Sequence, residues 1–144
     1  MRVRLDYGSD GLDVDLPDER VTVIEPVFRA AVEDPHAALI AALRAPVGRP
    51  SLRTLVTRGQ SIAISVCDIT RAQPRREMLR AVFDELPHIA DDDVTILIAT
   101  GTHRVNTDVE LERMLGADIV RRFRVGCTAC VTDDSPGVSP VPAR

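Results

Sequence analysis

Two largely apolar runs stand out in the pattern of hydrophobic and polar positions, at residues 61–67 and 94–99. Each is long enough for one strand and shows little alternation, which is typical of strands in a parallel sheet covered on both faces. Between them, apolar residues recur at helical spacing over 75–86, and Pro74 suits the start of that helix. Residues 107–114 predict another helix. This order predicts a right-handed βαβ unit with two parallel strands.

The amino-terminal residues predict a different element. Short strands are expected at residues 3–7 and 12–16, with a glycine-containing hairpin turn over 8–11. Asp34 suits the cap of a further helix that runs from residue 36 to residue 44. The predicted fold class is therefore α/β: a Rossmann-like three-layer domain with a mostly parallel sheet, preceded by a short N-terminal β-hairpin.

The pattern changes after Val125. Residues 126–144 show neither helical nor alternating periodicity and are interrupted by Pro and Gly. We therefore expect one domain over residues 1–125, whose last strand is cut short at 123–125, followed by an irregular, disordered tail. Translation out of frame past Val125 would explain the change, and so would a short gene product that another chain completes.

Composition narrows the possible functions. The chain has 144 residues, the size of one domain, with 3% aromatic residues and a net charge of −4. These values argue against a nucleic-acid-binding surface. No apolar run approaches the roughly 20 residues of a membrane span, and no signal peptide is apparent, so we expect a cytoplasmic protein. All 18 basic residues are Arg, which excludes lysine chemistry within this chain.

The cysteines and histidines do not predict a metal site. Cys67 ends an apolar strand, where an inert buried thiol is expected. Cys127 and Cys130 form a single CxxC pair without further ligands, which we interpret as accidental. The common glycine-rich nucleotide motifs are also missing.

Polar residues follow both predicted strands of the βαβ unit: Asp68, Thr70, Arg71, Gly101, Thr102 and His103. The carboxyl ends of parallel strands share one edge of a sheet, where ligands bind. His103 suits proton transfer, Asp68 can orient an imidazole, and Arg71 can clamp a carboxylate or phosphate. Each also has a plain structural interpretation, as a turn histidine, a turn-capping aspartate or a solvated arginine.

Two of these segments carry a family resemblance. Ser-Val-Cys-Asp-Ile-Thr-Arg at 65–71 and Ile-Ala-Thr-Gly-Thr-His-Arg at 98–104, with Glu-Leu at 110–111 and Leu-Gly at 115–116, resemble the N-terminal domain of the lactate racemase family. Its members are nickel-pincer-nucleotide-dependent 2-hydroxyacid racemases and epimerases. The resemblance covers about residues 5–125.

The resemblance implies roles for the site residues. His103 matches a catalytic histidine that takes the hydroxyl proton of a 2-hydroxy acid while the α-hydrogen moves as hydride to the cofactor. Arg71 matches the arginine that holds the substrate carboxylate. Asp68 matches the acidic residue of the same motif, in the site wall beside cofactor and substrate. The resemblance thereby implies a catalytic role for Asp68 and cofactor contacts for Asp68, Thr70, Gly101 and Thr102.

This sequence departs from the family in two ways. Ala72 stands where the family commonly has Pro, which should loosen the turn after Arg71. Family members also carry, further along, a second catalytic His, a Lys that anchors the cofactor, a nickel-ligating His and a C-terminal domain. This chain has no His after His103 and no Lys. We therefore expect it to be inactive alone, not to retain the cofactor, and to need the missing domain or a complementing chain as partner.

Two other functions stay open. One is a stand-alone binding module for small carboxylates or phosphates that uses Arg71, Thr102 and backbone donors. The other is a hydrolase or isomerase that uses His103 and Asp68 as a dyad without nickel.

Overall fold

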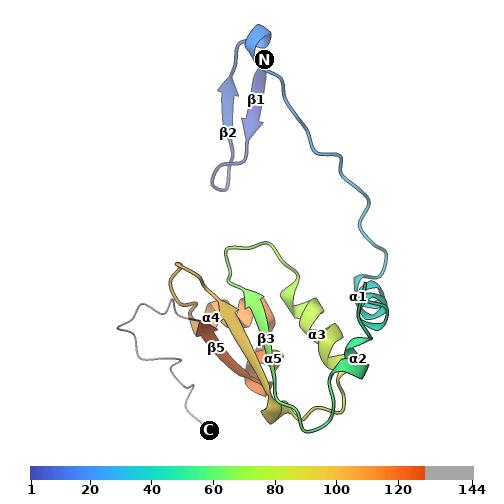
Figure 1. The fold of residues 1–144 in the computed structure, drawn as a ribbon. Coiled ribbons are helices and arrows are strands. Elements are labelled where there is room, and N and C mark those ends of the chain that lie inside the picture. Colours follow the sequence, from blue (N-terminus) through green and yellow to red (C-terminus); the bar gives the residue numbers. More distant parts are fainter. Residues whose placement is uncertain (129–144) are drawn as a thin grey trace. The chain divides into compact units, whose positions relative to one another are not determined.

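The computed structural model describes residues 1–128 (Figure 1). The chain forms two compact units, one over Met1–Ala31 and one from Val32 onward. The single domain expected over residues 1–125 stays a prediction. Most of the expected tail, residues 129–144, lies outside the described residues.

The first unit is the predicted β-hairpin. Strand β1 (Arg2–Leu5) pairs antiparallel with β2 (Leu12–Asp15), and a 3-10 turn, η1 (Asp18–Arg20), follows. The register places Val3 opposite Val14 and Leu5 opposite Leu12. Because side chains alternate along a strand, these four apolar residues share one face of the hairpin.

The second unit is built on a three-stranded parallel sheet in the order β3-β4-β5. Its strands are β3 (Ile62–Cys67), β4 (Val94–Ala99) and β5 (Arg124–Thr128). The two long apolar runs pair as predicted, with Ile64 opposite Ile96. The expectation that the last strand stops at 125 is wrong, because Gly126 and Cys127 continue β5 beside β4.

Side-chain caps mark the start of two of the helices within residues 1–128. They are α1 (Pro35–Arg44), α2 (Leu52–Leu55), α3 (Arg75–Glu85), α4 (Asp108–Leu115) and α5 (Ala117–Arg122), with a 3-10 turn, η2 (Asp91–Asp93), before β4. Asp34 caps α1 by accepting a hydrogen bond from the Ala37 amide, and Thr107 forms a capping box with Glu110 at α4.

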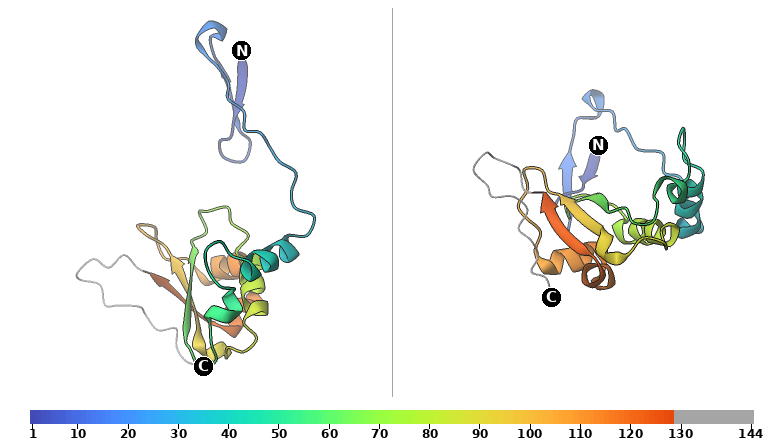
Figure 2. Two further views of the ribbon diagram at one scale, coloured as in Figure 1. Left: turned by 45° about the vertical axis from the view of Figure 1, so that its right-hand side comes forward. Right: turned by 60° about the horizontal axis from the view of Figure 1, so that its bottom comes forward.

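The core lies between one face of the sheet and the helices (Figure 2). Ile96 and Ile98 of β4 are fully buried and pack with Leu79 of α3 and Leu115 of α4. Leu97 lies on the opposite face and is only half-buried, and Ala63 of β3 is exposed there. The α/β class, the parallel sheet and the N-terminal hairpin are confirmed. Of the three expected layers, residues 1–128 build two.

No helix within residues 1–128 is both long enough and apolar enough to cross a lipid bilayer.

Candidate active site

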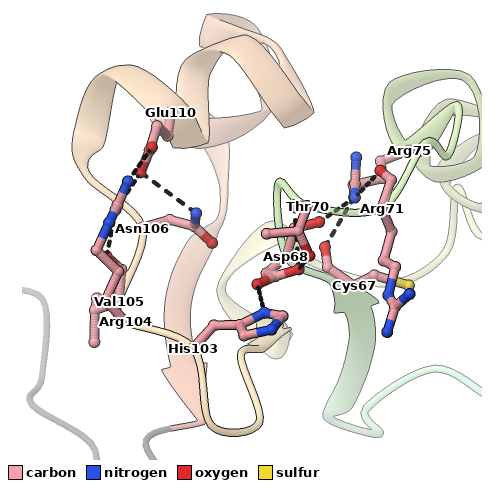
Figure 3. A network of polar contacts seen from close by, with 10 residues as sticks. All are labelled: Cys67, Asp68, Thr70, Arg71, Arg75, His103, Arg104, Val105, Asn106 and Glu110. Atoms are coloured by element: carbon pink, nitrogen blue, oxygen red, sulfur yellow. Dashed lines mark hydrogen bonds and ion pairs between the residues drawn. The ribbon is translucent and has the colours of Figure 1, made fainter. Parts of the chain in front are cut away.

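Two loops meet at the carboxyl edge of the sheet (Figure 3). The loop after β3 covers residues 68–74, and the loop after β4 covers residues 100–107. The strands are parallel and adjacent, with Cys67 paired to Ala99, so their ends bring both loops to the same edge. This arrangement brings Asp68 and His103 together although 35 positions separate them in sequence.

Asp68 uses both oxygens of its carboxylate. His103 Nδ1 lies 2.5 Å from Oδ2, and the hydroxyl of Thr70 donates to Oδ1 across 2.7 Å. The backbone amide of Thr70 also donates to Oδ1, at 3.3 Å. These bonds to the ionised form, from Thr70 first and His103 second, lower the pKa of Asp68 from its ordinary value. Asp68 is therefore a buried, ionised acceptor.

This pairing fixes the imidazole of His103. An ionised carboxylate only accepts hydrogen bonds, so Nδ1 of His103 carries the proton. When the ring is neutral, it presents the lone pair of Nε2, which is the position a general base uses. The side chain of Asp68 is 5% exposed, whereas that of His103 is 48% exposed. One member of the pair is thus held inside the protein and the other is open to a ligand.

Arg71 places a cation on the same loop as Asp68. Arg71 is exposed. Within residues 1–128 its guanidinium has no hydrogen-bond or ion-pair partner, whereas its backbone carbonyl accepts a hydrogen bond from Arg75. Figure 3 shows the guanidinium pointing away from the carbonyl groups of its loop. It is therefore available to pair with an anion, and a planar guanidinium suits a carboxylate.

Gly101 shapes the turn that carries His103. Its φ of 56° lies in the left-handed region, which glycine adopts at little cost. The amide of His103 donates to the carbonyl of Thr100 across 2.9 Å, which closes the turn. Thr102 is exposed at its tip. Among the predicted cofactor-facing residues, Thr70 is committed to Asp68, so its hydroxyl has only acceptor capacity left for a ligand.

Arg104 is not available to a ligand in the way Arg71 is. It forms two hydrogen bonds with Glu110, at 2.8 and 2.6 Å. Glu110 also accepts from the backbone amide of Thr107, so the pKa of Glu110 falls far below its usual range, chiefly through Arg104. Asn106, buried beside this pair, donates to Glu110 at 3.4 Å. This group ties the His103 loop to the start of α4.

Sequence reasoning missed Arg75. It is only 6% exposed and donates to carbonyl groups of the loop after β3. In the sequence, neither the position nor the charge of Arg75 distinguishes it from the exposed Arg76 that follows. The partners of Arg75 are backbone carbonyl groups, and these carry no sequence signal.

The described residues do not build a metal centre. Within residues 1–128, no group of three or more His, Cys, Asp and Glu side chains could hold a metal ion. His36 pairs with Asp84 at 3.1 Å, and His88 bonds to the carbonyl of Val56, so both lie away from His103. Cys67 and Cys127 are free thiols, and Cys130 lies outside the described residues.

A cavity of about 500 Å³ lies elsewhere, between α1, α3 and α5, over the stacked rings of Phe83 and Phe123. None of the predicted site residues lines it. The Asp68–His103 pair is therefore distinct from this cavity.

Comparison with known proteins agrees with the motifs at this edge. A family model described as the lactate racemase N-terminal domain matches residues 7–136. The chain belongs to this family. It is also 33% identical over 125 residues to the lactate racemase of Thermoanaerobacterium thermosaccharolyticum, across 82% of this chain and 29% of that protein.

A solved structure supports the same assignment. The structure of the lactate racemase apoprotein from Thermoanaerobacterium thermosaccharolyticum matches with a TM-score of 0.64 and 30% sequence identity, over 90% of this chain and 30% of that one. The chain therefore spans less than a third of the length of the relatives it matches. It is a racemase-related α/β domain.

Proposed function

We propose that the loops after β3 and β4 form the substrate-facing half of the active site of a 2-hydroxyacid racemase or epimerase. The observation that carries the proposal is the 2.5 Å contact between Asp68 and His103 Nδ1. The same loop as Asp68 carries Arg71, whose guanidinium has no partner within residues 1–128. A proton acceptor and a carboxylate-binding cation on one edge are what a 2-hydroxy acid requires, because it carries a hydroxyl next to a carboxylate.

Each residue has one role in this proposal. Arg71 binds the substrate carboxylate through paired hydrogen bonds and so fixes the position of the hydroxyl. His103 accepts the hydroxyl proton at Nε2. Asp68 holds the ring through Nδ1 and stabilises the imidazolium that forms, as the buried carboxylate does in other His–Asp pairs.

The family resemblance implies a nickel-pincer nucleotide, which would supply a hydride acceptor when bound. The chain has no Lys and three His, of which His36 and His88 are bonded elsewhere and His103 is bonded to Asp68. We therefore propose that groups anchoring the nucleotide come from the part of the relatives that this chain does not span, or from a complementing chain. Thr70, Gly101 and Thr102 are the residues here that would contact it.

Two consequences follow for the isolated polypeptide. We propose that it does not racemise a hydroxy acid alone, because the sequence has no Lys and no His after His103. It does bind a small carboxylate, because Arg71 is exposed and has no anionic partner within residues 1–128. The same observation favours a second candidate, a stand-alone module for small anions.

Calorimetry tests the binding part of the proposal. Titration of the purified chain with lactate should give measurable binding that Arg71→Gln weakens by roughly 10- to 100-fold, since hydrogen bonds to a charged group contribute about 1.5–3 kcal/mol. Arg113→Gln, an exposed arginine on α4, is the control and should leave the affinity unchanged. Equal binding of lactate and inorganic phosphate would favour the general anion module, and an unaltered affinity in Arg71→Gln would overturn both.

A further inference from the structure

A buried guanidinium lies directly behind the candidate site. Arg75, the first residue of α3, is 6% exposed. Its Nε donates to the carbonyl of Cys67 across 2.8 Å, and one of its terminal nitrogens donates to the carbonyl groups of Asp68 and Arg71, the latter at 2.6 Å (Figure 3). A weaker contact of 3.4 Å reaches the carbonyl of Gln73.

This placement is costly for an arginine. Within residues 1–128, Arg75 forms no ion pair with a carboxylate, and a buried charge without a counter-ion is unfavourable unless hydrogen bonds compensate. The amino-terminal end of α3 also carries the positive end of the helix dipole, which disfavours a cation. The carbonyl contacts are therefore the interactions that keep this side chain inside.

The carbonyl groups that Arg75 binds belong to the segment that carries the site. Cys67 ends β3, while Asp68 and Arg71 bound the turn that holds Thr70. Apart from Arg75, the turn is held by the two bonds from Thr70 to Oδ1 of Asp68 and by a backbone bond from Arg71 to Asp68 at 3.3 Å, which is long for a hydrogen bond. One planar group thus connects the end of the strand to both ends of the turn.

The residue after Arg71 increases the need for such a connection. Ala72 leaves its φ free, whereas a proline would fix it near −65°. Within residues 1–128, the amide of Ala72 donates no hydrogen bond to a backbone carbonyl in a turn or loop. A proline at this position would therefore stiffen the loop without removing a bond.

We propose that Arg75 is a positioning residue for the active site, whose guanidinium holds the loop after β3 so that Asp68 meets His103 and the side chain of Arg71 is left free for an anion. A lysine cannot replace it fully, because an ammonium group is a single point donor and lacks the planar fork that reaches three carbonyl groups at once. The part that concerns Arg71 rests on the proposed function, and the part that concerns Asp68 and His103 does not.

Nitrogen NMR of the His103 ring tests the proposal without any ligand. Two-bond proton–nitrogen correlations report which ring nitrogen carries the proton, and wild-type protein should show it on Nδ1, held by Asp68. Arg75→Gln should lose this tautomer preference and bind lactate about tenfold more weakly. Adding Ala72→Pro to Arg75→Gln should restore both, because it stiffens the same loop. Arg76→Gln, the exposed neighbour, is the matched control and should change neither.

The outcomes separate this inference from the proposed function. If wild-type protein does not bind lactate but Arg75→Gln loses the Nδ1 tautomer, the function fails and the positioning role stands. If Arg75→Gln keeps the wild-type tautomer, the positioning role is overturned. If Arg75→Gln does not fold, Arg75→Lys decides: a partial loss of the preference supports the proposal and full retention contradicts it.

Discussion

Asp68 and His103 belong to loops after neighbouring parallel strands, and 2.5 Å separates the carboxylate oxygen of one from the Nδ1 of the other. The contact exists because β3 and β4 are in register up to their last residues, Cys67 and Ala99. A shift of one strand by a single residue would turn Asp68 away from the imidazole. The geometry of the candidate site therefore depends on the register of the sheet.

Asp68→Asn should remove the control over the imidazole. An amide can donate as well as accept, so it does not force the proton onto Nδ1 of His103. We expect the His103 ring to lose its Nδ1 tautomer preference in the NMR experiment, while the fold is retained. Asp92→Asn, an exposed aspartate in η2 far from the site, is the control. A wild-type ring spectrum in Asp68→Asn would show that the carboxylate does not set the tautomer.

The contribution of Asp68 to stability should depend on pH in a defined direction. Its pKa is lower in the folded protein than in the unfolded chain, so folding favours the ionised form. The stabilisation is therefore fully present above the ordinary range of an aspartate, near pH 4. It is lost as the pH falls through the lowered pKa of the folded state.

Urea unfolding of wild type and Asp68→Asn between pH 7 and pH 3 measures this directly. The stability difference between the two proteins should shrink toward acid pH. Taking the difference cancels the contributions of Glu85 and Glu110, whose pKa values are also lowered by arginine partners. A difference that stays constant over the range would argue against an ionised Asp68 in the folded protein.

Gly101→Ala should strain the turn that carries His103. The residue has φ of 56°, and an added Cβ meets no atom within 4 Å, so the cost is conformational and about 1–2 kcal/mol. Gly59→Ala is a matched control, because Gly59 has φ of 85° and equally open surroundings but lies before β3. We expect chemical denaturation to show similar losses for both, and only Gly101→Ala to disturb the His103 ring signals. Equal ring spectra would mean that this turn does not position the imidazole.

The ion pair between α1 and α3 should matter more than its exposed counterparts. Arg44 donates to one oxygen of Glu85 at 3.0 and 2.8 Å, and the side chain of Glu85 is only 3% exposed. Arg44→Ala leaves this carboxylate buried without its main partner, which raises the pKa of Glu85 and lowers stability. Arg80→Ala breaks a pair with Asp118, which is 49% exposed and can be solvated. Thermal unfolding should therefore rank Arg44→Ala as the more destabilising change.

Local signals in the sequence were sufficient for the central architecture. The apolar runs that became β3 and β4, Pro74 before α3 and the capping box of Thr107 and Glu110 all act within a few residues, and the structure uses each of them. The meeting of Asp68 and His103 also follows, because parallel strands joined by a crossover helix end at the same edge.

Features that depend on tertiary contacts were not visible in the same way. Gly126 and Cys127 have no strand pattern of their own and become strand only by pairing with Leu97 and Ile98 of β4. Arg75 looks like a surface arginine because its partners are carbonyl groups, which sequence periodicity does not reveal. The family comparison supports the assignment as a racemase-related domain, but the functions of individual residues depend on the geometry described above.

The most direct test of the account is racemisation by a chimera. The matched segment of the lactate racemase from Thermoanaerobacterium thermosaccharolyticum is replaced by residues 7–136 of this chain, and the protein is loaded with the cofactor of the parent enzyme. We predict that the chimera interconverts the two enantiomers of lactate, and that His103→Gln slows it by on the order of 10²- to 10⁴-fold, the usual contribution of a general base. A chimera that racemises lactate equally well with His103→Gln would contradict the assignment of this edge as the substrate-facing half of the site.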